Sequence, residues 1–272
     1  MEPELSIITV NLNNGNGLAK TIKSVIYQCF NNYEFIVIDG DSTDSSIEVI
    51  KQFQTHISYW ISEKDKGIYQ AMNKGIMNAR GRYLLFLNSG DWLVNDQVLN
   101  TVFSERRTQD ILLGQCNISE NGRIIHTVIP PSQISFGYIY YLGLSHQSAF
   151  IKREVFNKYG LYREDFKYNG DIEFWYRTIV LNGCTTESLP ILISDYNLDG
   201  ISSKENHSEA YRKELDEIYA HPVLRLLIPD YEEWKREREE MKIMYWAKSK
   251  PTLNFLIKGL FCIASGLKKI RK

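Results

Sequence analysis

Residues 35–44 read FIVIDGDSTD, a short apolar run followed at once by a turn rich in carboxylates and hydroxyls. The first four residues have the composition of a buried β-strand, and the polar turn would end it. Ile47, Ile50 and Phe53 then recur at the spacing of a helix with one apolar face. The stretch therefore predicts a strand, a polar loop and a helix, in that order.

The same order of elements precedes this stretch. Residues 5–10 (LSIITV) form another apolar run, a polar turn covers 11–17, and apolar residues recur at helical spacing over 18–26. Downstream, residues 57–61 have the composition of a weak edge strand. Alternating strands and helices favour a parallel sheet, whose strands end at one edge and present their loops there.

An amphipathic helix is expected between Asp65, a candidate N-cap, and Gly81, a candidate C-terminal stop. Its apolar stripe consists of Ile68, Ala71, Met72, Ile76 and Ala79. Gly75 lies inside this helix, where a glycine costs about 1 kcal/mol relative to alanine. A close approach of the helix to the sheet would explain that glycine.

A further apolar run, 83–87, ends in the tetrapeptide 88–91 (NSGD). All four residues are good turn formers, so a simple turn is the ordinary interpretation. However, Asp39, Asp65 and Asp91 fall at successive strand ends and would meet at one edge of the sheet. This convergence suits a ligand with a base, a ribose and a diphosphate, and carboxylate oxygens are the ligands that Mg²⁺ or Mn²⁺ prefers.

The second half of the chain is less regular. We expect strands at 111–113, 124–128 and 148–151, helices at 153–159 and 172–181, and an aromatic-rich loop at 130–143. The mixed charges of 208–250 predict exposed helix, stabilised by ion pairs four residues apart. No internal repeat or low-complexity segment interrupts this order.

Composition excludes several classes of protein. The chain has 272 residues, 43% of them hydrophobic, which is enough for one substantial core. A net charge of −1 gives no general attraction to nucleic acid. The four cysteines are far apart, without metal-ligand spacing, and the N-terminus lacks a secretory signal. These features predict a cytoplasmic protein with reduced thiols and no nucleic-acid partner.

Five ordered motifs together resemble the family-2 inverting glycosyltransferases of the GT-A fold, over roughly residues 5–200. The motifs are the first strand (5–10), a counterpart of Asp-Asp-Gly-Ser-Thr-Asp (38–44), the Gly, Ala, Asn, Gly helix (65–75), the Asp-x-Asp position (88–91) and the Glu-Asp position (170–171). The resemblance implies a Rossmann-like nucleotide-diphospho-sugar transferase, an α/β fold whose mostly parallel central sheet is flanked by helices.

The resemblance also implies a division of the chain. Residues 1–205 would form the GT-A catalytic domain, with a nucleotide-sugar-binding half (1–115) and an acceptor-binding half (116–205). Residues 206–272 would form a helical C-terminal extension. Apolar residues of 252–272 follow helical spacing, and basic residues close the chain. This last segment could bind an anionic membrane surface, at the inner face of the cytoplasmic membrane, or pack on the catalytic domain.

Two departures from the family pattern bear on the chemistry. Asn88 and Gly90 stand where the Asp-x-Asp motif has acidic residues, which leaves Asp91 as the only anionic candidate ligand for Mn²⁺ or Mg²⁺. Gly170 stands where the family has Glu, but the family's base aligns with Asp171. The resemblance therefore implies Asp171 as general base, whereas the residue types alone also allow a helix cap.

Further site residues follow from the aligned motifs. The resemblance implies nucleotide-sugar contacts from Thr9, Val10, Asn11, Asp39, Asp65, Gly67, Asn88 and Ser89. It implies acceptor contacts from His146, Gln147 and Trp175. A lone histidine before a strand is, however, more often a structural hydrogen-bond donor. The aromatic residues of 136–141 could stack on a sugar or cover the core.

The implied activity is inverting transfer of a sugar from a nucleotide-sugar donor, with a UDP-sugar expected, to a glycan or a polyprenyl-linked saccharide. The expected setting is assembly of a bacterial polysaccharide or glycolipid. Two alternatives stay open. A sugar nucleotidyltransferase uses a similar sheet and Mg²⁺, but residues 11–17 lack the basic phosphate loop that it needs. A non-catalytic nucleotide- or glycan-binding module would explain Asn88 and Gly90, and it would not hydrolyse a donor.

Overall fold

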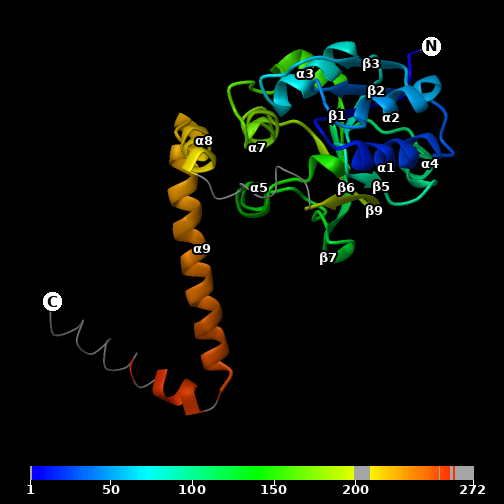
Figure 1. Cartoon of the computed structure of the whole chain (residues 1–272). Coiled ribbons are helices and arrows are strands. Elements are labelled where there is room, and N and C mark those ends of the chain that lie inside the picture. The colour runs from blue at the N-terminus through cyan, green and yellow to red at the C-terminus, as the bar shows by residue number, and fades with distance from the viewer. Residues whose placement is uncertain (1, 199–208, 251, 258–259, 261–272) are drawn as a thin grey trace. The chain divides into compact units, whose positions relative to one another are not determined.

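Four parallel strands form the part of the sheet that the alternating pattern predicts. They are β1 (Leu5–Asn11), β2 (Tyr33–Asp39), β3 (Tyr59–Ser62) and β4 (Tyr83–Phe86). β1 lies between β2 and β4, and β3 is the edge strand beside β2 (Figure 1). The register places Asn11 beside Asp39, and Asp39 beside Ser62. Three strand ends therefore meet at one edge, as expected.

The remaining strands extend the sheet beyond β4. They are β8 (Ala149–Lys152), β6 (Ile111–Glu120), β9 (Thr186–Asn197), β5 (Trp92–Leu93) and β7 (Arg123–Val128). The order is β3-β2-β1-β4-β8-β6-β9-β5, with β7 paired to β6. β8 is antiparallel to both β4 and β6. The sheet is thus parallel from β3 to β4 and mixed beyond, since β8 runs antiparallel to both neighbours while β6 and β9 are parallel.

Helices cover both faces of this sheet. They are α1 (Gly15–Ile26), α2 (Ser46–Gln52), α3 (Ile68–Asn78), α4 (Val98–Val102), α5 (Phe136–Leu142), α6 (Arg153–Tyr159) and α7 (Gly170–Trp175). Short turns at Gln54–His56 (η1) and His146–Ser148 (η2) and a π-helical segment at Tyr176–Val180 (η3) complete them. α1, α2 and α4 lie on one face, and α3 lies on the other (Figure 1).

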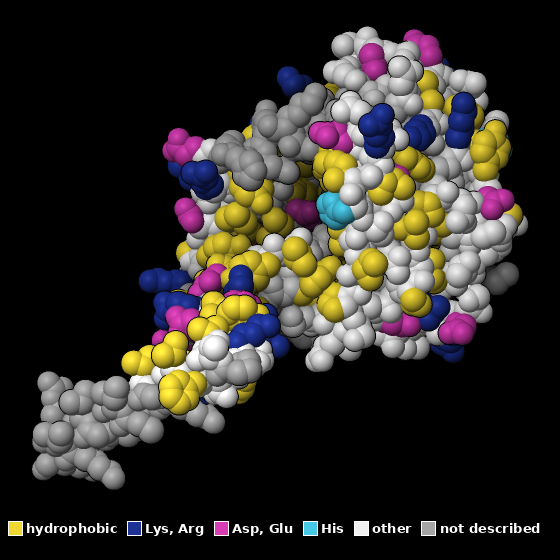
Figure 2. All heavy atoms as spheres, turned by 90° about the horizontal axis from the view of Figure 1, so that it is seen from below, with side chains coloured by type: hydrophobic (Ala, Val, Ile, Leu, Met, Phe, Trp, Pro, Cys, Tyr) yellow, Lys and Arg dark blue, Asp and Glu magenta, His cyan; other side chains and the backbone are white. Residues whose placement is uncertain are grey.

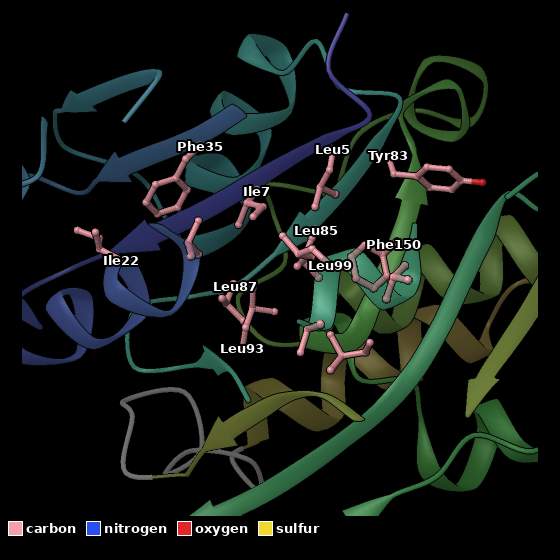
Figure 3. Packing of buried hydrophobic residues seen from close by; sticks show 14 of the residues in the cluster. Leu5, Ile7, Ile22, Phe35, Tyr83, Leu85, Leu87, Leu93, Leu99 and Phe150 are labelled. Atoms are coloured by element: carbon pink, nitrogen blue, oxygen red, sulfur yellow. The ribbon is translucent and has the colours of Figure 1, made fainter. Parts of the chain in front are cut away.

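The core forms because successive side chains of β1 point to opposite faces. Leu5 and Ile7 pack with Ile22 of α1 in a cluster of buried apolar residues (Figure 3). Ile8 points to the other face, where a Cβ atom added to Gly75 would lie 2.4 Å from its Cγ2. The prediction that Gly75 marks a close approach of α3 to the sheet is confirmed.

Three local expectations were wrong. The predicted loop 130–143 contains α5, which Ser135 caps by accepting the Tyr138 N–H. Aromatic residues are weak helix formers, but Phe136 and Tyr140 stack one turn apart with ring centroids 5.7 Å apart. The N-cap of α3 is Gly67, not Asp65. The helix expected at 172–181 is split into α7 and η3.

The computed structural model describes residues 2–198, 209–250, 252–257 and 260. Contacts separate two units along the chain, 1–216 and 217–272. α8 (Glu209–Tyr219) and α9 (Pro222–Lys248) supply the exposed, mixed-charge helices that the composition predicts.

Most of the predicted surface helix 252–272 lies outside the described residues. No helix within the described part of the chain is long and apolar enough to cross a membrane.

Candidate active site

A buried carboxylate links the three parallel strand ends. Asp39 is 0% exposed. Its Oδ1 accepts hydrogen bonds from Asn11 Nδ2 (2.7 Å) and Ser42 Oγ (2.6 Å). Its Oδ2 accepts from Ser62 Oγ (2.6 Å) and the Ser42 amide (3.0 Å). With both oxygens already bonded within the protein, Asp39 fixes the strand ends and the turn that follows β2.

The NSGD turn lies beside the end of β1. Thr9 Oγ1 donates to the Leu87 carbonyl (2.7 Å), and the Ser89 amide donates to the Val10 carbonyl (3.0 Å). Asn88 follows Leu87 directly, so the structure brings together the four predicted donor-site residues Thr9, Val10, Asn88 and Ser89 at this edge.

Backbone conformation explains the glycine in this turn. Gly90 has a φ of +104°, in a region that residues with a side chain rarely adopt. Thr21 of α1 holds the turn in place, because its Oγ1 accepts the Gly90 N–H (3.0 Å) and donates to the Asp91 carbonyl (2.6 Å). An acidic residue at position 90 would have to adopt that strained conformation.

Asp91 is a buried carboxylate, 4% exposed. Its Oδ1 accepts the Asn197 N–H at 3.2 Å. Burial, with a smaller contribution from Asp195, raises its pKa to about 7, although Asn197, His146 and Gln147 act in the opposite direction. No lysine or arginine of the described residues forms an ion pair with Asp91.

A divalent cation at Asp91 would need further ligand atoms from a bound molecule or water. The described residues contain no group of three or more His, Cys, Asp or Glu side chains that could hold a metal ion. A cation beside the carboxylate would nevertheless offset the cost of ionising it in a buried position. Asp91 therefore stays the candidate metal residue of this turn, and any further ligands would have to come from a bound molecule or water.

Asp171 lies at the start of α7, where three groups hold its carboxylate. His146 Nδ1 is 3.2 Å from Oδ2, the Tyr69 hydroxyl is 3.0 Å from Oδ1, and the Ile172 amide donates to Oδ1 at 2.9 Å. The other ring nitrogen of His146 is 3.3 Å from Asn88 Nδ2. The structure thus connects the NSGD turn, the segment before β8 and the predicted base.

Tyr69 is a site residue that the pattern analysis missed. It belongs to α3, and the helical spacing of the apolar stripe gives a tyrosine at this position no polar role. Burial and, secondarily, the Asp171 carboxylate hold the pKa of Tyr69 well above its ordinary value, so the hydroxyl keeps its proton and can donate. The polar hydroxyl of a residue flanking the apolar stripe was the available signal.

A second missed residue is Glu214 of α8. Its carboxylate accepts the backbone N–H groups of Lys167 (2.6 Å), Tyr168 (3.0 Å) and Asn169 (2.8 Å). These three residues directly precede α7, which carries Asp171 at its second position. α8 therefore fixes the start of the helix that presents the predicted base.

The other predicted residues differ in their exposure. Gln147 is buried and interacts with Asp91. Trp175 is 0% exposed and packs edge-on against Phe174, so its side chain offers no surface to an acceptor. Asp65 forms a 2.6 Å ion pair with Lys74.

Gly67, the other predicted donor contact in this segment, has open space around it, because no atom lies within 4 Å of an added Cβ.

Apolar side chains are exposed on α5 and β7. They are Tyr141, Leu142, Ile124 and Ile125, of which Leu142 is 72% exposed. Figure 2 shows hydrophobic side chains on the surface of the larger unit. α5 ends at Leu142, four residues before His146, so these exposed apolar residues are close to His146 in the sequence.

Sequence comparison places the chain among known transferases. The family model described as Glycosyl transferase family 2 matches residues 6–128. An uncharacterized glycosyltransferase of Mycobacterium tuberculosis is 29% identical over 219 residues, which are 77% of this chain and 80% of the relative. The UDP-Glc:alpha-D-GlcNAc-diphosphoundecaprenol beta-1,3-glucosyltransferase WfgD of Escherichia coli is 23% identical, over 82% of this chain and 89% of the relative.

Solved structures share the fold. Staphylococcus aureus TarS (residues 1–349), in complex with UDP-GlcNAc, superposes with a TM-score of 0.64 at 18% identity. The match covers 79% of this chain, which spans 65% of that structure. The mannosyltransferase PcManGT of Pyrobaculum calidifontis, in complex with GDP-Man and Mn²⁺, gives a TM-score of 0.58 at 13% identity over 99% of this chain and 88% of its own.

The central sheet with its flanking helices is of the GT-A type, as the motifs predict. Residues 6–128 match the model of glycosyl transferase family 2, and the relatives to which most of the chain is similar are glycosyltransferases.

Proposed function

We propose that the chain transfers a sugar from a nucleotide-sugar donor, with a UDP-sugar as first choice, to a hydroxyl of a saccharide or polyprenyl-linked saccharide, with inversion. The observation that carries this proposal is the Asp171 carboxylate, held by His146 and Tyr69 next to the NSGD turn. The UDP-GlcNAc in TarS and the diphosphoundecaprenol acceptor in the name of WfgD support the two substrate classes and a place in bacterial glycan assembly.

The donor would bind at the edge formed by β1, β2 and the NSGD turn. The side-chain oxygens Oδ1 of Asn11 and Asn88 are buried and have no hydrogen-bond partner among the described residues. Such oxygens can accept from the imide N–H of a base or from a sugar hydroxyl. Asp65 and Gly67 would complete the donor site, and Asp39 would act by holding Asn11.

Asp171 would serve as the general base. An acceptor hydroxyl is a poor nucleophile until its proton is removed, and a positioned base typically contributes about 10²–10⁴-fold to the rate. The acceptor oxygen would attack the anomeric carbon while Asp171 takes its proton. The bond to the diphosphate oxygen breaks with its electron pair, which leaves with the nucleoside diphosphate. One displacement inverts the configuration at that carbon.

Asp91 is the proposed residue for Mn²⁺ or Mg²⁺. A bound cation would supply electrostatic stabilisation of the departing diphosphate. The Mn²⁺ in PcManGT supports this assignment. The raised pKa of Asp91 makes the carboxylate a group whose ionisation a neighbouring cation would favour.

The acceptor would bind on the His146 side of Asp171. His146 and Gln147 remain acceptor-side candidates, whereas buried Trp175 would act only through packing. The exposed apolar residues of α5 offer a place for the lipid part of a polyprenyl-linked acceptor. Residues 252–272, with their basic end, would hold the enzyme at an anionic inner-membrane surface.

The test measures release of nucleoside diphosphate and product formation with a panel of nucleotide sugars and saccharide acceptors. Asp171→Asn should lower transfer by about two orders of magnitude or more, while donor affinity changes little. Asp165→Asn is the matched control, because Asp165 is exposed and paired with Arg163. Near-normal transfer by Asp171→Asn would show that Asp171 is only a structural residue. Nucleotide binding without turnover by the wild-type protein would indicate a non-catalytic module.

A further inference from the structure

We propose that Asn88 and His146 are positioning residues for Asp171, and that Asn88 selects the protonation form of the imidazole. In this arrangement Asn88 donates an N–H to Nε2, which holds His146 neutral with its hydrogen on Nδ1, and that hydrogen is donated to Asp171. The inference rests on the proposed role of Asp171 as base. It concerns which ring nitrogen of His146 carries the hydrogen.

The contacts form a chain of three side chains from three parts of the sequence. Asn88 Nδ2 lies 3.3 Å from His146 Nε2, and His146 Nδ1 lies 3.2 Å from Asp171 Oδ2. Asn88 comes from the turn after β4, His146 from η2 and Asp171 from α7. The imidazole therefore bridges the turn and the proposed base, and both of its nitrogens are in use.

Donor and acceptor types determine where the hydrogen lies. An ionised carboxylate only accepts, so the nitrogen that faces Asp171 must carry a hydrogen. The nitrogen of an amide group only donates, so Nε2 must present its lone pair to Asn88. An imidazole with one hydrogen, on Nδ1, satisfies both contacts. An imidazolium would place two N–H groups against each other at Asn88.

The neutral form matters for a base. A neutral N–H orients the carboxylate, as the Tyr69 hydroxyl does on the other oxygen. An imidazolium would add a full positive charge 3.2 Å from Oδ2, which favours the ionised carboxylate and opposes its uptake of a proton. Asn88 thus keeps Asp171 oriented without reducing its ability to accept the proton of the acceptor hydroxyl.

This arrangement gives a reason for the amide at position 88. An aspartate there would accept from Nε2 and hold a second hydrogen on the ring, between two carboxylates. Asp91 and His146 interact electrostatically, so a carboxylate at position 88 would be a further negative charge close to the ring. Asn88→Asp, which restores the acidic residue of the Asp-x-Asp motif, should therefore impair the enzyme.

The first test is ¹⁵N NMR of histidine-labelled full-length protein near neutral pH without added metal, with His146→Gln used to assign the resonances. The expected spectrum shows His146 neutral, with hydrogen on Nδ1 and a lone pair on Nε2. In Asn88→Asp, Nε2 should gain a hydrogen. A wild-type imidazole with hydrogen on Nε2, or no change in Asn88→Asp, would overturn the proposal.

The second test measures transfer by the same variant. Asn88→Asp should lower kcat at least tenfold, a loss of about 1.4 kcal/mol in transition-state stabilisation. Asn78→Asp is the matched control, because Asn78 is exposed at the end of α3 and its side chain donates to the Lys74 carbonyl of the same helix. Unchanged or faster transfer in Asn88→Asp would overturn the positioning role.

The two hypotheses fail separately. If Asp171→Asn retains transfer, the base assignment fails whatever the imidazole does. If Asp171→Asn loses transfer but His146 carries its hydrogen on Nε2, the base stands and the role of Asn88 fails.

Discussion

The ring of Tyr69 occupies the space that a side chain at position 170 would need. A Cβ atom on Gly170 would lie 2.8 Å from Cε2 of Tyr69, closer than such atoms approach in real proteins. The same tyrosine places its hydroxyl 3.0 Å from Asp171 Oδ1. The glycine at the position where the family has Glu is therefore explained by the residue that helps to hold the proposed base.

Gly170→Ala should lower the free energy of unfolding by about 1–3 kcal/mol, because the new methyl group must displace Tyr69 in a packed interior. The measurement is urea unfolding, compared with Gly67→Ala. An added Cβ at Gly67 meets no atom within 4 Å, so that variant should stay within about 0.5 kcal/mol of the wild type. Equal stability of the two variants would contradict the packing argument.

Gly90→Asp, which adds an acidic residue to the NSGD turn, should destabilise the protein by about 1–3 kcal/mol, because its φ of +104° strains any residue with a side chain. Thermal and urea unfolding measure this cost. Gly90→Ala should show a similar loss, which separates backbone strain from the added charge. If Gly90→Asp is as stable as the wild type and binds Mn²⁺ more tightly, the turn tolerates the family motif.

Asp91 should make stability depend on pH. Its pKa in the folded chain is about 7, above the ordinary 3.8, so the folded state holds the proton more tightly than the unfolded chain does. The resulting stabilisation is complete below the ordinary pKa and is lost as the pH rises through about 7. From about pH 5 to about pH 8, the wild type should lose about 1 kcal/mol or more relative to Asp91→Asn.

Added Mn²⁺ provides the control for that prediction. A cation at Asp91 favours the ionised carboxylate, so Mn²⁺ together with a nucleoside diphosphate should reduce the loss at high pH in the wild type but not in Asp91→Asn. Parallel pH profiles of the two proteins would show that Asp91 does not titrate with a raised pKa. Full transfer activity in EDTA would remove the metal from the proposed reaction.

Glu214→Ala should loosen the loop before α7, because three backbone N–H groups lose their acceptor. Amide hydrogen exchange at residues 167–169 should become at least tenfold faster, and kcat for transfer should fall more than donor affinity. Glu209→Ala is the control, since Glu209 is exposed and, among the described residues, pairs with Lys213 on the same helix. Unchanged exchange at 167–169 would show that α8 does not hold this loop.

The order of elements in the first half could be read from the chain because it depends on local patterns. The apolar runs correctly predict β1, β2 and β4, and the helical spacing of Ile68 to Ile76 correctly predicts α3. Gly75 could be interpreted from sequence because a glycine inside a helix needs a compensating close contact. Periodicity and residue volume act over a few residues, so one sequence suffices to interpret them.

The partners of the polar side chains depend on the tertiary structure. The spacing of Asn88, His146 and Asp171 in the sequence does not indicate that two contacts of about 3 Å join them. No sequence pattern predicts that Tyr69 contacts Asp171, or that Glu214 accepts from the loop before α7. The motif order predicted Asp39 as a nucleotide contact, but only the structure reveals that both of its oxygens are bonded to neighbouring strands and loops. Local composition determines which elements form and which polar residues end them. The partner and the protonation form of each polar residue are determined by packing between distant segments, because a buried hydrogen-bonding group is costly without a partner and can use only the donors or acceptors that folding places beside it.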